Sequence, residues 1–301
     1  MKHTLKITII LALAFLFSQV IGLAITNEYI DHDVTSETGN VTWSALPYDI
    51  ARPEVEESSS FIFIIAAILL GTLLIFLIIK FGKMLWWKIW FFLAVTVTLV
   101  VAFNSFMPQV LAGLLALILA SYKIFKPNVY LHNITELFIY GGLAAIFVPI
   151  MNVFSVIMLL ILISIYDMIA VWKSGHMIKL AKFQTKSKVF AGLLIPYNKP
   201  KSLKNIPKSQ LKKVKVNTAV LGGGDIGFPL IFAGVIMKGL MITHPQWLGF
   251  LKALIIPIFT SIALLWLLVK SEKNKFYPAM PFLTAGCFAG YIVLLLVNLI
   301  G

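Results

Sequence analysis

Apolar segments long enough to cross a lipid bilayer recur along the whole chain. A transmembrane helix needs about 20 predominantly apolar residues, and inside the bilayer its backbone hydrogen bonds must be satisfied within the protein. Lysine-bearing connections separate several of the segments. The segments are residues 5–25, 61–79, 86–103, 109–125, 136–148, 151–172, 216–237, 248–269 and 279–300. We therefore predict an all-α, polytopic integral membrane protein with nine transmembrane helices.

Composition supports this fold class. Hydrophobic residues make up 60% of the chain and charged residues 12%, and the mean hydropathy is +0.95; soluble domains carry about 25% charged residues. The net charge of +13 could attract nucleic acid, but the charges lie in short clusters between apolar segments, as in membrane-protein loops. We expect the lipid bilayer as a partner and no nucleic acid. The single cysteine, Cys287, excludes an intrachain disulfide.

Two segments near the amino terminus need separate interpretation. Residues 5–25 follow two lysines and end at small residues, so they could form a signal peptide, but their length also suits a full span. The residues alone leave this choice open. Residues 26–60 carry eight acidic residues and Arg52 as the only basic one. We interpret them as an acidic external loop.

The distribution of basic residues predicts the topology. With the amino terminus inside, 22 of the 25 basic residues fall in inner connections, and only Arg52, Lys238 and Lys252 fall in outer ones. Positive charge marks cytoplasmic loops. We therefore predict a cytoplasmic amino terminus, an external carboxyl terminus and a multi-pass protein of the cell (plasma) membrane.

We expect one membrane-embedded domain over residues 1–301. Residues 1–172 would form the first six spans, residues 173–215 a basic cytoplasmic loop, and residues 216–301 the last three spans. The loop contains twelve lysines and no acidic residue, so we expect it to be mobile and to lie against anionic head groups. Docking or processing of a substrate within the loop is the alternative.

Two acidic residues stand within the apolar segments. Of the twelve acids, eight lie in the external loop, Glu136 begins a span and Glu272 lies in a lysine-rich loop, which leaves Asp167 and Asp225. Ionising such a carboxyl group in the hydrocarbon layer costs several kcal/mol. At 1.5 Å per helical residue, Asp167 lies roughly 9 Å and Asp225 at most about 15 Å from the cytoplasmic edge. Both fall in the same half of the membrane on consecutive spans, where they can meet.

This pair of acids has a defined chemistry. The sequence places no cation at the same depth, so two facing carboxyl groups would share a proton, because two adjacent negative charges cannot both persist. Such a pair can hydrolyse a peptide bond: one ionised Asp takes a proton from water, and the protonated one donates to the scissile carbonyl. The sequence does not assign these two roles.

Three motifs, on the sixth, seventh and ninth predicted spans, resemble the signatures of one enzyme family. The motifs are Tyr166-Asp167, Gly222-Gly223-Gly224-Asp225 and Pro278-Ala279-Met280-Pro281. In this order they resemble those of the presenilin family and its relative, signal peptide peptidase, which are GxGD-type intramembrane aspartyl proteases. The resemblance covers essentially the whole chain. Met280 departs from the Leu that the family usually has, but Met is apolar and similar in volume.

The resemblance implies an intramembrane aspartic endopeptidase that hydrolyses peptide bonds within transmembrane segments of membrane proteins. It implies Asp167 and Asp225 as catalytic residues, without metal or cofactor. The implied substrate-binding residues are Tyr166, Gly222, Gly223, Gly224, Pro278, Ala279, Met280 and Pro281. The predicted orientation is that of presenilins, since signal peptide peptidases are inserted the opposite way, and the short basic loop is similar to that of prokaryotic or archaeal members. A homo-oligomer stays open, and the sequence requires no accessory subunit.

Other interpretations of the same residues remain. The glycines could serve only close helix packing, and the prolines could merely begin a helix. The two acids could relay protons or bind a cation in a proton- or cation-coupled transporter or channel, although no inverted repeat is visible. A non-enzymatic scaffold is the third alternative. The five histidines lack metal-ligand spacing, so we propose no metal site.

Overall fold

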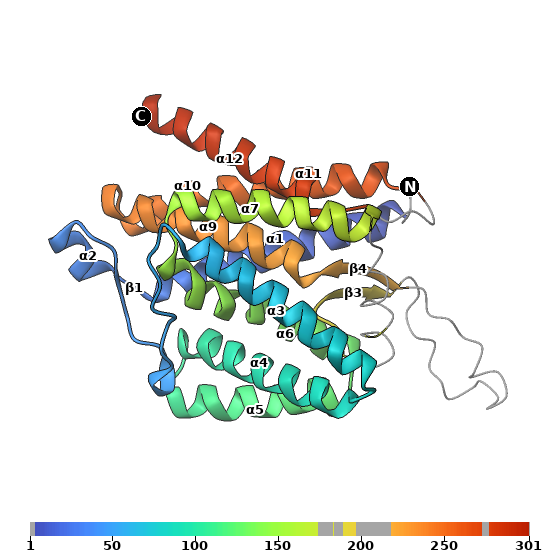
Figure 1. Ribbon diagram of the computed structural model, residues 1–301. Helices are drawn as coiled ribbons and strands as arrows, with labels where there is room; N and C mark the ends of the chain where they lie inside the picture. The colour runs from blue at the N-terminus through green and yellow to red at the C-terminus, as the bar shows by residue number, and fades with distance from the viewer. Residues whose placement is uncertain (1–3, 174–182, 184–188, 197–217, 273–276, 301) are drawn as a thin grey trace.

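The computed structural model describes residues 4–173, 183, 189–196, 218–272 and 277–300, and its long helices lie side by side in one bundle (Figure 1). Eight helices are long and apolar enough to cross a membrane, and Gln109–Phe125 is apolar but shorter. The bundle helices are α1 (Leu5–Glu28), α3 (Ser60–Lys80), α4 (Met84–Asn104), α5 (Gln109–Phe125), α6 (Val129–Phe147), α7 (Val153–Met168), α9 (Gly223–Thr243), α11 (Ile255–Lys270) and α12 (Met280–Ile300). This confirms a mostly helical, multi-pass membrane protein.

Helix α9 occupies the centre of the bundle and α3 its periphery. In the apolar stretch of α9, 72% of the residues are buried, against 6% in α3. Helix α1 packs against α6, α9 and α11, and its Gln19 Nε2 donates a hydrogen bond to the Ile226 carbonyl at 2.9 Å. Helix α1 therefore supplies part of the core.

Proline and asparagine residues set the helix boundaries. Pro149 lies in the short turn η2 (Val148–Ile150) between α6 and α7, and the Asn152 side chain then caps α7 by accepting from Ser155 N at 2.8 Å. Helix α10 (Gln246–Ala253) ends just before α11, in which Pro257 cannot donate a hydrogen bond back to Ala253. The predicted span 248–269 therefore contains a break.

The predicted span 136–148 is wrong at its start. Helix α6 begins at Val129, where the Asn128 side chain caps it by accepting from Tyr130 N. Glu136 lies in the middle of this helix and is 1% exposed, and Lys123 of α5, predicted to be a cytoplasmic charge, is 4% exposed. Their side chains pair at 2.6 Å. Because each charge neutralises the other, Glu136 is tolerated in the middle of α6 and Lys123 is buried in the last turn of α5.

The external loop predicted over residues 26–60 contains ordered structure. Strand β1 (Ile30–Asp31) pairs with β2 (Thr42–Trp43). The short helix α2 (His32–Thr38) connects the two strands, and the turn η1 (Pro47–Asp49) follows β2. The Tyr29 hydroxyl donates to the Val101 carbonyl at 2.8 Å, which ties this segment to α4. The prediction of an all-α fold is therefore incomplete.

A second antiparallel pair, β3 (Gly192–Pro196) and β4 (Thr218–Gly222), lies at the other end of the bundle from α2 (Figure 1). In its register, Gly192 faces Gly222 and Leu194 faces Val220. Two sequence predictions are wrong here: residues 192–196 are a strand within the basic connection, and the predicted span 216–237 contains a strand before its helix. Most of residues 173–215 lie outside the described residues.

Candidate active site

Asp225 lies in the first turn of α9, directly after strand β4. Gly222 ends the strand in an extended conformation, and α9 begins at Gly223. A Cβ on Gly223 would lie 2.7 Å from the Tyr140 hydroxyl, too close unless something shifts, and one on Gly222 would make a tight contact at 3.1 Å with Asp225 Oδ2. The glycines thus allow a strand to turn into a buried helix beside a carboxyl group.

Asp167 lies in the last turn of α7, which continues as the π-helical turn η3 (Ile169–Lys173). Its carboxylate oxygen Oδ2 accepts a hydrogen bond from the Met280 backbone N–H at 3.1 Å. Met280 begins α12, whose first amides have no partner within the helix, and Pro281 has no amide hydrogen to satisfy. Asp167 therefore caps α12 and connects two of the three sequence motifs.

One cavity of about 510 Å³ brings both acids together. Helix α3 contributes Ile65, Ile68 and Leu69 to its wall, which is otherwise mostly apolar. Of the residues predicted from the sequence, those that line the cavity are Tyr166, Asp167, Gly222, Gly223, Gly224, Asp225 and Met280. Asp167 and Asp225 therefore face the same mostly apolar space. An apolar chamber lined by two acids suits acid–base chemistry on a bound peptide.

The predicted residues Pro278, Ala279 and Pro281 are not part of the cavity lining. They shape the start of α12 instead, where the Ala279 carbonyl accepts from the backbone N–H groups of Phe282 and Leu283, both at 3.1 Å. This turn aims the Met280 amide at Asp167. The segment therefore contacts the site through backbone groups at the start of α12, those of Ala279 and Met280, which bond to Asp167.

Phe190 and Ala191, which were not predicted from the sequence, precede β3 and also line the cavity. The Ala191 carbonyl accepts from Gly223 N at 3.1 Å, so this segment lies directly against the glycine motif. A signal was present: Leu193-Leu194-Ile195 is an apolar run bounded by Gly192 and Pro196 within a lysine-rich connection.

The two edges of the β3–β4 pair have different surroundings. The backbone N–H and C=O groups of Leu194 bond to the Asn133 side chain of α6 at 2.9 and 2.8 Å. These groups point away from β4, so Leu194 and Val220 form a non-hydrogen-bonded pair. The backbone groups of Val220 therefore point away from β3, to the outer edge of β4. Among the described residues, no further strand lies on that edge, and Val220 is 48% exposed. Strand β4 thus presents a free edge that leads into Gly222 and Asp225.

Comparison with known proteins identifies the family. Residues 45–300 match the family model described as signal-peptide peptidase, presenilin aspartyl protease. Two solved structures of a presenilin family intramembrane aspartate protease, in C222 and P2 crystal forms, share the fold. The first has a TM-score of 0.62 and 18% identity over 96% of this chain and 99% of that one. The second has a TM-score of 0.57 and 18% identity over 95% and 96%. No curated protein matches the chain.

Proposed function

Because the chain belongs to the signal peptide peptidase and presenilin family of aspartyl proteases, we propose that Asp167 and Asp225 are its catalytic residues. We propose as substrates the transmembrane segments of other membrane proteins, whose peptide bonds are hydrolysed in the cavity. The observation that carries this proposal is the single cavity lined by both acids together with Tyr166, the three glycines and Met280. The family match favours a protease over the transporter or channel alternative.

The proposed chemistry uses one ionised and one protonated Asp. The ionised carboxylate takes a proton from a water molecule, the water oxygen attacks the scissile carbonyl carbon, and the protonated carboxyl group donates to the carbonyl oxygen. A tetrahedral diol results. As it collapses, the carboxyl group that took the proton from water gives it to the leaving nitrogen, the other carboxylate takes a proton from a diol hydroxyl, and the C–N bond breaks. Because both carboxyl groups line one mostly apolar cavity, we expect their proton transfers to be coupled.

A helical substrate hides every backbone carbonyl in its own hydrogen bonds, so the segment to be cleaved must unwind. The unwound segment then needs new backbone partners. We propose that it adds as a strand to the free edge of β4 at Val220 and Gly222, three residues before Asp225. Tyr166, the glycines and Met280 would then contact the extended substrate, and the prolines at 278 and 281 would hold the start of α12 in place.

For the whole chain we propose nine spans, a cytoplasmic amino terminus and an external carboxyl terminus in the plasma membrane. The eight long apolar helices together with the shorter α5 support this count. The start of α1 lies at the β3–β4 end of the bundle and the end of α12 at the α2 end, as an odd number of spans requires (Figure 1). In this arrangement the basic connection, and with it the site, is on the cytoplasmic side. No accessory subunit is needed in this proposal.

The test is a cleavage assay with purified protein and a transmembrane peptide in lipid vesicles. Asp167→Asn and Asp225→Asn are each expected to abolish the products, with a loss of at least about 10³-fold, because neither Asn can exchange a proton. The matched control, Asp33→Asn in exposed α2, is expected to cleave like the wild type. Cleavage by either site variant refutes the dyad, and ion flux without cleavage supports the transporter.

A further inference from the structure

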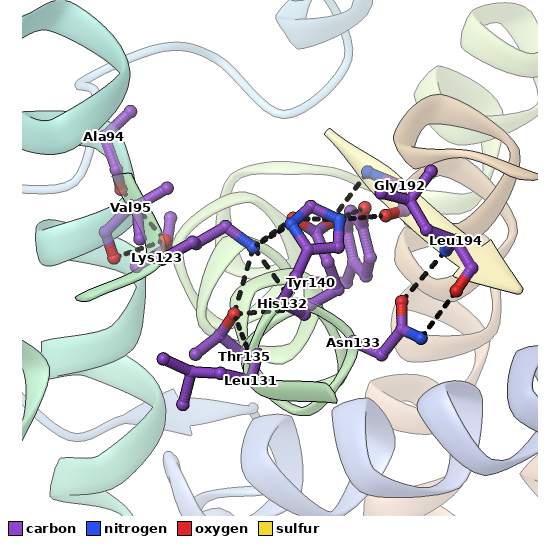
Figure 2. Close-up of polar contacts among 12 residues, drawn as sticks. Ala94, Val95, Lys123, Leu131, His132, Asn133, Thr135, Tyr140, Gly192 and Leu194 are labelled. Atoms are coloured by element: carbon purple, nitrogen blue, oxygen red, sulfur yellow. Dashed lines mark hydrogen bonds and ion pairs between the residues drawn. The ribbon is translucent and has the colours of Figure 1, made fainter. Parts of the chain in front are cut away.

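A cluster of charged and polar side chains is buried behind the β3–β4 pair (Figure 2). It consists of Lys123 from α5 with His132, Thr135, Glu136 and Tyr140 from α6, all less than 9% exposed. Charged groups inside a membrane bundle are costly, and apolar residues of similar volume often stabilise a core at least as well. Packing alone therefore does not account for this cluster.

Lys123 is fully committed within the cluster. Its ammonium nitrogen Nζ lies 2.6 Å from Glu136 Oε1, 3.0 Å from Thr135 Oγ1 and 3.2 Å from His132 Nδ1. The His132 carbonyl oxygen lies 3.3 Å away as a fourth acceptor, so all three ammonium hydrogens have a partner. The Tyr140 hydroxyl donates to the other carboxylate oxygen of Glu136. Every member is held by at least one other, so the cluster is rigid.

The hydrogen bonds of His132 assign its tautomer. Nε2 lies 2.7 Å from the Gly192 carbonyl oxygen, which can only accept, so Nε2 carries the hydrogen and Nδ1 accepts from Lys123. Glu136 Oε2 accepts from Gly192 N at 2.9 Å. The cluster thus holds both backbone groups of Gly192, as Figure 2 shows beside the Asn133 contacts to Leu194.

Strand β3 needs such a fixed point. Its central residues, Leu193, Leu194 and Ile195, are all apolar, so the hydrophobic pattern does not distinguish one register from a slipped one. Directional bonds from charged groups do distinguish them, and they are roughly twice as strong as neutral ones. The cluster therefore fixes the register in which Gly192 faces Gly222.

The cluster also supports the start of α9. The Tyr140 ring lies against Gly223 and Gly227, since a Cβ on Gly223 would lie 2.7 Å from its hydroxyl and one on Gly227 would lie 3.7 Å from Cδ1. These glycines flank Asp225 on either side. Tyr140 thus contacts the first turn of α9, while His132 and Glu136 hold the strand paired with β4.

We propose that Lys123, His132, Glu136 and Tyr140 are positioning residues that determine which peptide bond of the substrate meets Asp225. They do not line the cavity, as the described residues define it, and they act through the backbones of Gly192 and Gly223. This inference rests on the proposed function. If the register of β4 slips or loosens, an added substrate strand moves with it, and neighbouring bonds reach the acids.

The test uses the full-length protein in lipid vesicles, with a transmembrane peptide whose products are identified by mass spectrometry. His132→Leu removes the bond to Gly192, and Tyr140→Phe removes the bond to Glu136. In each, kcat is expected to fall by about tenfold, as for a lost buried hydrogen bond, with KM within about twofold. Cleavage is expected to spread to adjacent peptide bonds.

Two further variants separate positioning from general stability. His132→Gln retains an N–H donor for Gly192 and is expected to restore a single main product. Thr260→Val removes a buried hydroxyl from α11, away from β3, and is expected to keep the wild-type product pattern. A stability role alone would lower the amount of folded enzyme in all destabilised variants without moving the cleavage site.

The outcomes distinguish this inference from the proposed function. Wild-type kcat and products in both His132→Leu and Tyr140→Phe overturn the positioning role, and so does lower yield with an unchanged product pattern. In either case the dyad stands as long as Asp225→Asn is inactive. Cleavage by Asp225→Asn overturns the proposed function itself.

Discussion

The ion pair between Lys123 and Glu136 gives the most demanding test of the structure. The two side chains are 2% and 1% exposed, and Nζ and Oε1 lie 2.6 Å apart. At that distance two unit charges attract by about 6 kcal/mol in a medium with an effective dielectric constant near 20. Desolvation of both charges offsets most of this attraction, so the net contribution of the pair is far smaller than the Coulomb energy.

Removing one partner differs from removing both. Glu136→Gln leaves a buried ammonium without a counter-charge, and Lys123→Met leaves a buried carboxylate, so each is expected to lower the free energy of unfolding by about 3–5 kcal/mol. The double variant leaves no net buried charge, and we expect it to recover all but about 1–2 kcal/mol. The coupling energy between the two sites is then at least about 3 kcal/mol.

The assay is reversible unfolding of the purified protein in detergent micelles, followed by tryptophan fluorescence, for the wild type, the two single variants and the double variant. Lys126→Met removes an exposed lysine just after α5 and serves as the control, with an expected change below about 0.5 kcal/mol. Additive effects, or a Glu136→Gln variant as stable as the wild type, would refute the buried pair and the corrected start of α6.

Two further predictions concern the site. Gly223→Ala would place a Cβ 2.7 Å from the Tyr140 hydroxyl and shift Asp225, so the cleavage rate should fall by at least about tenfold. The control is Gly239→Ala, in the same helix with open space around it, which should cleave at the wild-type rate in the same assay. Met280→Asp puts a second carboxyl group beside Asp167, and its rate of product formation should fall below detection, whereas Met280→Leu should lose less than about threefold. Equal rates for the two variants in either comparison contradict the geometry.

The residues that line the cavity could be predicted where their signal is local. Asp167 and Asp225 stand out because acids are rare in apolar segments, and the three glycines mark the helix start because they weaken a helix wherever it lies. That Asp167 and Asp225 lie close together could be predicted because they are on consecutive spans at a similar depth in the membrane. The roles assigned to them stay a prediction until the variants are assayed.

Lys123 and Glu136 could not be interpreted from local pattern. Thirteen residues separate them along the chain, on different helices, and each on its own is typical of a helix end at the membrane surface. Only the packing of α5 against α6 makes them partners. Strand β3 has a local signal in its apolar run, but its pairing with β4 and its contacts to Asn133 are tertiary and could not be predicted from that run.

The late predicted start of α6 and the missed strand β3 have one physical origin. A strand pair inside a membrane protein has two edges, and unpaired backbone groups are not tolerated in lipid. One edge of the β3–β4 pair is satisfied by polar side chains of α6, namely His132, Asn133 and Glu136. His132 and Asn133 made residues 129–135 look too polar for a span.

The other edge belongs to β4 and is left for a different partner. Because α6 already satisfies β3, the backbone groups of Val220 and Gly222 face away from it, on the side where the cavity is lined by Gly222 and Asp225. An unwound substrate would gain at this edge the hydrogen bonds that it lost as a helix. In the proposed function, the cost of unwinding is offset where the scissile carbonyl would lie beside Asp167 and Asp225, and the charged cluster of α5 and α6 would serve that site by holding β3, and through it β4, in place.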